Sequence, residues 1–250
     1  MLPSPTAQSF LASIDIKHGP RELLTSFFVK AVNAIEMRGI SFEVGTFKQL
    51  LEINQQHPDS WMPLTTTFRW DIGGVDDSTG VVFIGCNASG EPVATQAARH
   101  FDWAETNFKE EAESLRFFYS DPTTQKAEQE ACVVTTPVAK DVTGSVGLAG
   151  GLWIRPDYRR LQLTSITPRL ARAYALANWN IETMMAIMTK ANIEHGLAKR
   201  NGFQDVSWGV QMHNSPTYPN GILDVGLARL SAYELVDDLY QFLVNFKDAR

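Results

Sequence analysis

Five arginines gather in one short stretch of the chain and could bind a phosphate-bearing ligand. They fall between residues 155 and 172, where Asp157 is the only acid. Five positive charges and one negative charge give this stretch a local charge of +4, in a chain whose net charge is −6. Guanidinium groups bind phosphate oxygens through paired hydrogen bonds. The same pattern is also typical of a solvated basic helix face, so the neighbouring sequence has to decide. The arginines are Arg155, Arg159, Arg160, Arg169 and Arg172.

The segments around these arginines predict a strand, a tight turn and a helix. Residues 146–154 (VGLAGGLWI) form an apolar run typical of a strand, and apolar residues at helical spacing predict a helix over about 165–179. Pro168 is compatible with this helix because it falls in the first turn. Backbone N–H groups at a helix N-terminus attract anions. A phosphate cradle is therefore expected in the turn, although such turns usually contain glycines and this one contains none.

Two adjacent glycines, Gly150 and Gly151, interrupt the strand that enters the turn. Paired glycines inside a strand indicate a bulge or a close backbone approach. A bulge would separate this strand from the next apolar run at 183–188 (TMMAIM) and would expose backbone groups at Leu152 and Ile154. The alternative is a tolerated pair of small core residues.

Strand-like and helix-like segments alternate through the rest of the chain. This order predicts an α/β (α+β) mixed sheet with helices on both faces. The first 19 residues or so are expected to form a loose arm, and Pro137 makes 131–138 an edge strand or loop. Further strands are expected at 40–44, 81–86, 93–101, 207–212 and 223–230, and helices at 20–38, 47–56, 106–118, 192–203 and from Ser231 onward.

Composition narrows the class of protein. The 250 residues are 44% hydrophobic and 20% charged, which is enough to build one sizeable core. The acidic balance, with a pI of about 5.4, argues against nucleic acid as a partner. No signal peptide is visible and the apolar runs are too short to span a bilayer, so no membrane association and a cytoplasmic location are predicted. Cys86 and Cys132 are then expected to be free thiols. The five histidines show no metal-binding spacing, so no metal site is expected.

Two phrases in the second half resemble a known family. The first runs from Ile154 through Arg155, Pro156, Asp157 and Tyr158 to Arg159, and the second is Lys-Arg-Asn-Gly-Phe at 199–203. In this order and spacing they resemble the GNAT superfamily of acyl-CoA-dependent N-acetyltransferases, in which a bulged strand leads into a Q/R-x-x-G-x-G/A loop that binds pyrophosphate. The resemblance covers roughly residues 80–230. It identifies a divergent member with a degenerate loop, since Gln162 and Thr164 occupy the two small positions.

The resemblance implies a GNAT-like acyl-CoA N-acyltransferase fold. An N-terminal arm and helix would occupy residues 1–39, and a single domain would occupy 40–250, with a helical insert at about 102–142. Acetyl-CoA or another acyl-CoA would be the cofactor. The residues expected to bind it are Leu152, Trp153, Ile154, Arg159, Arg160, Leu161, Gln162, Leu163 and Thr164.

The catalytic group is harder to assign. The position where many members of the family place a tyrosine falls on Ala198, so His195, three residues earlier, is the candidate proton donor. His100 and Asp102, near where acceptors enter in the family, are weaker candidates. Acidic residues on the insert at 110–113 would attract a cationic amine or form a solvated helix face.

The expected function is therefore acyl-CoA-dependent N-acyl transfer. The group transferred is expected to be acetyl, and the acceptor a small amine or an amino-acid-like molecule. Three alternatives stay open. One is a catalytically silent GNAT-like module that binds CoA or another ligand. Another is a long-chain acyltransferase of the acyl-homoserine-lactone-synthase type. The third is a homodimeric scaffold paired through the N-terminal helix.

Overall fold

One mixed sheet organises the molecule. The computed structural model describes residues 4–247, and in this part eight strands follow the order β1-β2-β3-β5-β6-β8-β7-β4. Every neighbouring pair is antiparallel except β5 and β6, which are parallel. The strands are β1 (Ser41–Gly45), β2 (Gly80–Cys86), β3 (Pro92–Trp103), β4 (Ala131–Val134), β5 (Gly144–Ile154), β6 (Thr183–Thr189), β7 (Val206–Ser215) and β8 (Tyr218–Ser231).

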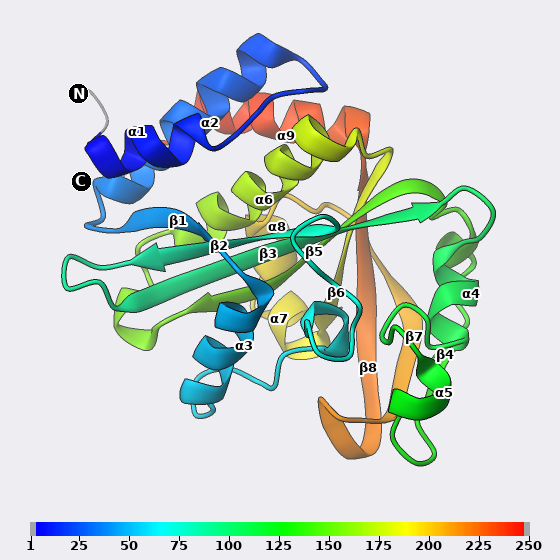
Figure 1. Cartoon of the computed structure of the whole chain (residues 1–250). Helices are drawn as coiled ribbons and strands as arrows, with labels where there is room; N and C mark the ends of the chain where they lie inside the picture. Colours follow the sequence, from blue (N-terminus) through cyan, green and yellow to red (C-terminus); the bar gives the residue numbers. More distant parts are fainter. Residues whose placement is uncertain (1–3, 248–250) are drawn as a thin grey trace.

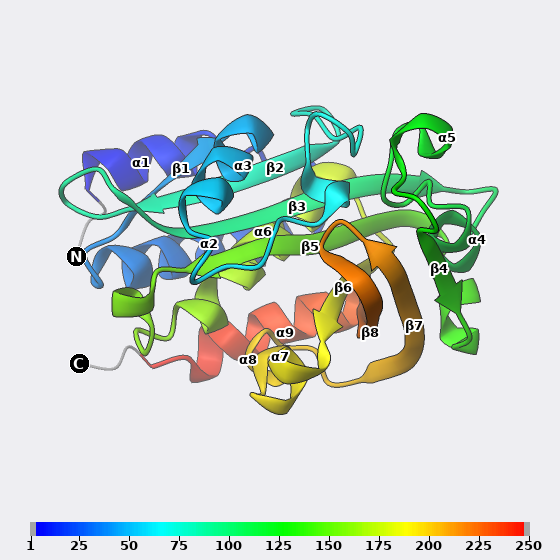
Figure 2. The same ribbon diagram turned by 90° about the horizontal axis from the view of Figure 1, so that it is seen from below.

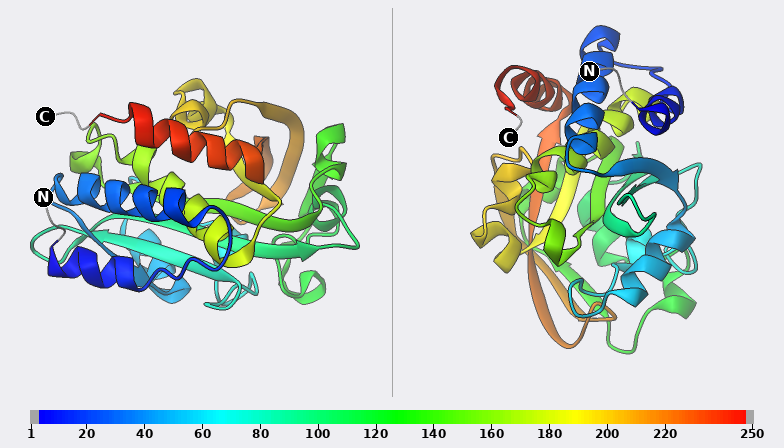
Figure 3. Two further views of the ribbon diagram at one scale, coloured as in Figure 1. Left: turned by 90° about the horizontal axis from the view of Figure 1, so that it is seen from above. Right: turned by 90° about the vertical axis from the view of Figure 1, so that its left-hand side faces the viewer.

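Helices cover both faces of this sheet, as predicted for a mixed α/β fold (Figure 1). One face carries α1 (Pro5–Ala12), α2 (Arg21–Glu36), α6 (Leu163–Trp179) and α9 (Ala232–Asn245), which lie side by side above the strands in Figures 1 and 3. The other face carries α3 (Phe47–Gln56), the short 3-10 turn Thr66–Phe68 and α4 (Phe108–Glu113). Two hydrophobic cores result, one on each side of the sheet.

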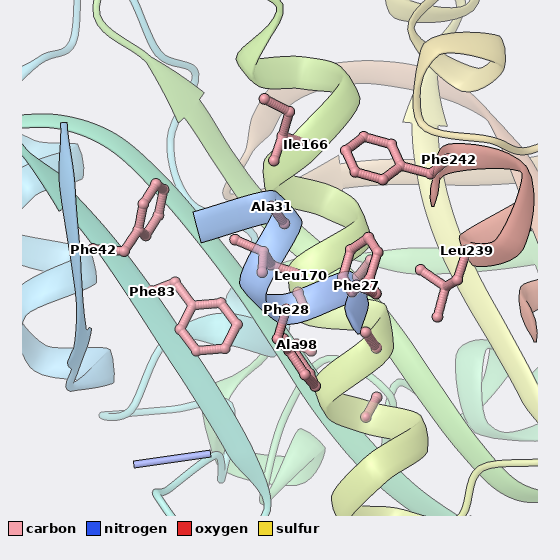
Figure 4. Packing of buried hydrophobic residues seen from close by; sticks show 14 of the residues in the cluster. Phe27, Phe28, Ala31, Phe42, Phe83, Ala98, Ile166, Leu170, Leu239 and Phe242 are labelled. Atoms are coloured by element: carbon pink, nitrogen blue, oxygen red, sulfur yellow. The ribbon is translucent and has the colours of Figure 1, made fainter. Parts of the chain in front are cut away.

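The core under the four helices joins the two ends of the described chain. Phe27 of α2 meets Phe242 of α9 edge to face, with ring centroids 5.4 Å apart (Figure 4). Leu170 of α6 is fully buried in the same cluster. Phe10 of α1 packs against Phe83 of β2 at 5.4 Å. The prediction of a loose N-terminal arm is therefore wrong for α1, which Ser4 caps and which buries Ala7 and Phe10.

The expected insert lengthens the sheet. After β3 the chain forms α4, the single turn α5 (Pro122–Gln125) and β4, and β4 then pairs with β7 at the far edge of the sheet (Figure 2). This confirms the edge strand. The helix expected at 106–118 ends at Glu113, because Leu115 adopts a left-handed φ of 64°. Its predicted apolar stripe is nevertheless buried.

Most other elements agree with the sequence pattern. The capping boxes at Thr46 and Ser231 are both present. The helix expected at 192–203 is instead two short helices, α7 (Lys190–Glu194) and α8 (Leu197–Arg200), because Gly196 between them has a left-handed φ of 73°. Cys86 and Cys132 are free thiols, and Cys132 is buried.

Within residues 4–247, none of the helices combines the length and the apolar character needed to cross a bilayer.

Candidate functional site

The only parallel strand pair of the described sheet separates after three residue pairs. β5 and β6 are paired at Val146–Leu148 and Thr183–Met185, and no pairing continues beyond Leu148. Past that point β5 stays with β3, and β6 stays with β8 as far as Thr189. The two strands therefore diverge beyond these pairs, as Figure 2 shows. We call the place where they part the β5–β6 fork.

The predicted bulge lies on the β5 side of this fork. Ala97 of β3 faces Gly150, whereas Thr95 faces Trp153, so β5 contains one residue more than β3 between these pairs. Gly151 takes a left-handed φ of 60°, which a residue with a Cβ rarely adopts. Gly150 is close-packed, because a Cβ there would lie 2.2 Å from the ring of Phe68. Gly151 is thus favoured by the backbone path, and Gly150 by the close packing against Phe68.

Side chains of β3 hold the two bulge carbonyls. The Thr95 hydroxyl donates to the Gly151 carbonyl at 2.8 Å, and the Gln96 amide donates to the Gly150 carbonyl at 2.9 Å. In a trans peptide the carbonyl and the following N–H point in opposite directions. The N–H of Leu152 therefore points away from Thr95, toward the fork.

The next part of β5 also directs backbone groups into the fork. Arg155 N–H bonds to the Val93 carbonyl of β3 at 2.8 Å, so Arg155 and Trp153 are the β5 residues that bond to β3. Ile154, one residue out of phase, turns its N–H and C=O to the other side. Of the three expected strand residues, Leu152 and Ile154 therefore face the fork with their backbone groups, and Trp153 does not.

An aromatic group covers the end of β5 on the α3 side. Trp153 is buried, its ring N–H donates to the Ser60 hydroxyl at 3.0 Å, and His57 stacks on it at 4.4 Å. Trp61 lies parallel to the same ring at 5.7 Å. The segment after α3 thus closes one side of the strand and fixes its position.

The turn after β5 follows a path that glycine would normally supply. A 3-10 turn at Pro156–Tyr158 leads to Arg160 and Gln162, which have left-handed φ values of 75° and 57°. Such a backbone costs a residue with a Cβ about 1 kcal/mol or more. The loop therefore keeps a glycine-like shape without glycines. Gln162 then precedes α6 with no side-chain cap, and α6 begins at Leu163, two residues earlier than the sequence indicated.

Three of the five arginines in this region are already ion-paired. Arg155 contacts Asp157 at 2.8 Å and Glu91 at 3.2 Å. Arg169 and the fully buried Arg172 share Asp238 of α9, at 2.8 and 3.1 Å. Glu91 and Asp238, which lie far away in the sequence, therefore compensate two charges of the expected local +4 and leave +2.

Arg159 and Arg160 lie in the loop itself, and both are exposed. Arg159 donates to the Ile154 carbonyl and to the Ser60 carbonyl, each at 3.2 Å. Because the Ile154 carbonyl faces the fork, the Arg159 side chain lies along the mouth of the fork. Leu163 is buried, while Leu161 and Thr164 are half-buried at the start of α6.

The candidate proton donors occupy different surroundings. His195 is exposed at the end of α7, and its Nδ1 lies 2.7 Å from the Ala191 carbonyl. Ala198 is buried on α8, so the break at Gly196 places these two residues on separate short helices rather than on one helix face. His100 bonds to the Ser145 hydroxyl at 2.9 Å and stacks on Trp179.

Burial lowers the pKa of His100 below its ordinary value, and the nearby Asp102 opposes this only in part. Asp102 is exposed. The acids of the insert are engaged locally, since Glu111 pairs with Arg116 and Glu113 pairs with Lys109. Glu110 bonds to Asn107, the cap of α4.

A groove lies in another part of the molecule. Its volume is about 420 Å³, and it lies beside the insert, between α4, α5 and β4, with Glu113 and Glu130 among its lining residues. Both carboxylates bond within the protein, Glu113 to Lys109 and Glu130 to the Tyr119 hydroxyl at 2.7 Å. Across residues 4–247, no group of three or more His, Cys, Asp or Glu side chains is placed to hold a metal ion.

Sequence reasoning missed three residues of the site. Thr95 and Gln96 lie in a strand whose alternation gave no sign of a role at the bulge. Arg38, at the end of α2, donates to the Leu161 carbonyl at 2.5 Å and to the Gln162 side chain at 3.2 Å. Its distance from the loop along the sequence hid this contact.

The order of elements around the fork is the one that the GNAT resemblance implies. A bulged strand is followed by a loop, α6, β6, the α7–α8 pair, Gly202-Phe203 and two further strands. No family model matches the sequence, and no curated protein matches it.

Solved acetyltransferases resemble the chain at low identity. Arabidopsis thaliana NAA60 in complex with acetyl-CoA is 14% identical over 78% of this chain and 99% of that chain, with a TM-score of 0.48. A dodecameric spermidine N-acetyltransferase from Vibrio cholerae is 10% identical over 77% and 94%, with a TM-score of 0.43. AAC(6')-Ib in complex with parmomycin and acetyl-CoA is 9% identical over 84% of this chain and 99% of that chain, with a TM-score of 0.44. Because the identities and TM-scores are this low, a function has to be inferred from the geometry of the fork itself.

Proposed function

We propose that the chain is a GNAT-type acyl-CoA-dependent N-acyltransferase that moves an acetyl group from acetyl-CoA to a small amine. The observation that carries this proposal is the β5–β6 fork, in which a bulge turns the Leu152 N–H away from β3 at the place where the parallel strands part. An ordinary sheet core has no need for such a parting of paired strands. Acyl transfer does need a fixed N–H donor beside an open space.

The bulge would polarise the thioester. When the amine nitrogen attacks the carbonyl carbon, a C–N bond forms, the C–S bond breaks and negative charge develops on the carbonyl oxygen. The N–H of Leu152 would donate to that oxygen. A donor that is already fixed in place costs nothing to reorganise at the moment of reaction, and removing one such donor typically slows a reaction about 10² to 10³-fold. The backbone of Ile154 would hold the pantetheine amides along the strand.

The loop would hold the pyrophosphate. The left-handed residues Arg160 and Gln162 lead into the N-terminus of α6, where no side chain makes a capping hydrogen bond to the backbone N–H groups. Backbone N–H groups from Arg160 to Thr164 and the partial positive charge of the helix suit an anion there. Arg159 and Arg160 would add charge at the mouth of the fork.

His195 is the proposed proton donor to the departing thiolate. If Nδ1 carries the proton that is shared with the Ala191 carbonyl, Nε2 of the neutral ring is an acceptor. Nε2 would take up a proton from solvent, to which the attacking amine loses one, and would then deliver it to the sulfur, so the protons balance. His195→Ala should lower the rate at which CoA thiol is released. Unchanged release would remove this assignment and leave the fork as the catalytic element.

A catalytically silent CoA-binding module is the second candidate, because the buried Ala198 occupies the position where the family carries a tyrosine. Calorimetry with CoA and acetyl-CoA tests binding, and release of free thiol over a panel of diamines, amino acids and aminoglycosides tests transfer. Binding with transfer supports the enzyme, and binding without transfer supports the module. Absence of binding at millimolar ligand would reject both.

A further inference from the structure

An arginine from outside the resembling region holds the proposed phosphate loop. Arg38 follows α2 and lies 123 residues before Leu161 in the sequence, yet its Nε donates to the Leu161 carbonyl at 2.5 Å. The same guanidinium donates to the Gln162 side chain at 3.2 Å and to the Ala34 carbonyl of α2. It also lies 5.7 Å from the ring of Phe246, which ends α9.

These contacts reach Gln162, which is unusual both in its residue type and in its backbone conformation. Gln162 stands where the family pattern has a small residue, and its backbone is left-handed with a φ of 57°. A side chain at such a position opposes the backbone path and can occupy the space that a phosphate needs. Arg38 binds that side chain and the carbonyl of the residue before it, so it draws Gln162 toward α2.

The contact also orients the backbone. When the Leu161 carbonyl points to Arg38, the N–H of Gln162 in the same trans peptide points the opposite way. That direction leads away from α2. A guanidinium is suited to this task because its donors are fixed in one plane and can bond to a carbonyl and an amide together.

We propose that Arg38 is a positioning residue that takes over the role of the missing loop glycine. It holds the Leu161 carbonyl and the left-handed Gln162 in place and keeps the Gln162 side chain out of the cradle. The N-terminal extension is then part of the cofactor site. This inference rests on the proposed function for its ligand, but its structural claim concerns the free protein.

The first experiment uses the free protein, and so it is independent of whether CoA binds. Amide hydrogen exchange across residues 159–165 is compared between the wild type and Arg38→Gln. Arg21→Gln is the matched control, because Arg21 begins the same helix and donates to the Ile16 carbonyl, far from the loop. We expect faster exchange in this segment for Arg38→Gln alone, with the rest of α6 unchanged. Equal exchange in all three proteins would overturn the positioning role.

The second experiment measures the ligand. Calorimetry with CoA should give a dissociation constant about tenfold weaker for Arg38→Gln, as expected for loss of a charged hydrogen bond. In kinetics the KM for acetyl-CoA should rise while kcat and the KM for the amine stay constant. Arg38→Lys should restore binding only in part, because an ammonium cannot form the same planar pair of bonds.

Gln162→Gly supplies the decisive comparison. If Arg38 compensates for the side chain at position 162, Arg38→Gln should cost much less CoA affinity in the Gln162→Gly background than in the wild type. An equal cost in both backgrounds would show that Arg38 only stabilises the fold, and would overturn the proposal. Thermal unfolding of each variant identifies any loss of folded protein. If wild type itself binds no CoA, the proposed function fails, while the exchange result still decides the role of Arg38.

Discussion

The two halves of β5 have the same partner on one side and different surroundings on the other. The first half, around Val146–Leu148, is paired with β3 and with β6 and is buried in regular ladder. The second half, Gly150–Ile154, keeps β3 but loses β6. Its register shifts, and side chains of β3 satisfy its carbonyls.

The difference shows how a sheet can be both a scaffold and a site. Where both neighbours are present, the backbone groups are consumed by the ladder and have no further use. Where one neighbour leaves, a bulge can turn an N–H toward the space that the neighbour vacated. The chemistry is therefore expected where the ladder stops, and the first half of β5 is expected to matter for stability alone.

The largest contrast should come from adding a methyl group to each half. A Cβ at Gly150 would lie 2.2 Å from the rigid ring of Phe68, whereas a Cβ at Gly147 would meet the flexible Met184 Sδ at 2.6 Å. Gly150→Ala should cost about 1–3 kcal/mol of unfolding free energy through overpacking. Gly147→Ala should cost less, because a methionine can move aside. Urea unfolding measures both.

Activity should separate the same two variants further. Gly150→Ala should abolish most acyl transfer even in the fraction of protein that stays folded, while Gly147→Ala should keep its kcat. Equal kcat values for the two folded variants would mean that the bulge has no part in the reaction.

A smaller effect is expected from the hydroxyl that holds the bulge. Thr95→Val keeps the shape of the side chain and removes the bond to the Gly151 carbonyl. The lost bond should cost about 1 kcal/mol of unfolding free energy. It should also lower kcat, since the Leu152 N–H is no longer fixed. Thr95→Ser keeps the hydroxyl and is the control, and it should behave as the wild type does. A Thr95→Val protein with wild-type kcat would argue against oriented N–H donation.

The smallest effect is a pH dependence of stability at His100 of β3, which faces the first half of β5. His100 faces Gly147 and bonds to Ser145, and burial lowers its pKa below the ordinary value of 6.5. The unfolded chain therefore takes up the proton more readily than the folded protein. This contribution to stability is complete above the ordinary pKa and is lost as the pH falls below it.

Urea unfolding at a pH of about 7.5 and a pH of about 5.5 measures this loss on either side of the ordinary pKa. His100→Asn should flatten the difference between the two pH values. His195→Asn, which changes an exposed imidazole, is the control and should leave the difference intact. If His100→Asn keeps the full difference, another group is responsible.

Much of the scaffold could be predicted from local pattern. Alternation and helical spacing placed the hairpin β2–β3, the strands β5 to β8 and the helices α2, α3, α6 and α9, because these signals are local. The bulge was also predictable, since glycine is favoured at the left-handed φ of Gly151 and fits the close contact at Gly150. The loop position followed from its place between a strand and a helix.

The electrostatics of the site could not be predicted in this way. Asp238 of α9 pairs with both Arg169 and Arg172 of α6, which lie 69 and 66 residues before it, and Arg38 reaches the loop across 123 residues. Such partners are set by tertiary packing, which no local window contains. The shape of the loop was missed for a related reason. The missing glycines indicated a degenerate loop, whereas Gln162 adopts a glycine-like backbone and is bonded by Arg38.

The contact between α2 and α9 has a consequence for how the chain folds. Lys30 of α2 donates to the Leu243 carbonyl of α9 at 2.7 Å, so the first long helix rests on the last one. Contacts of this sequence separation slow folding, because a long loop must close before they form. During synthesis, the face of Phe27 that packs on Phe242 stays exposed until α9 has been made. Refolding should accordingly be slow and prone to aggregation at high concentration, and α9 should be the element whose docking completes the fold.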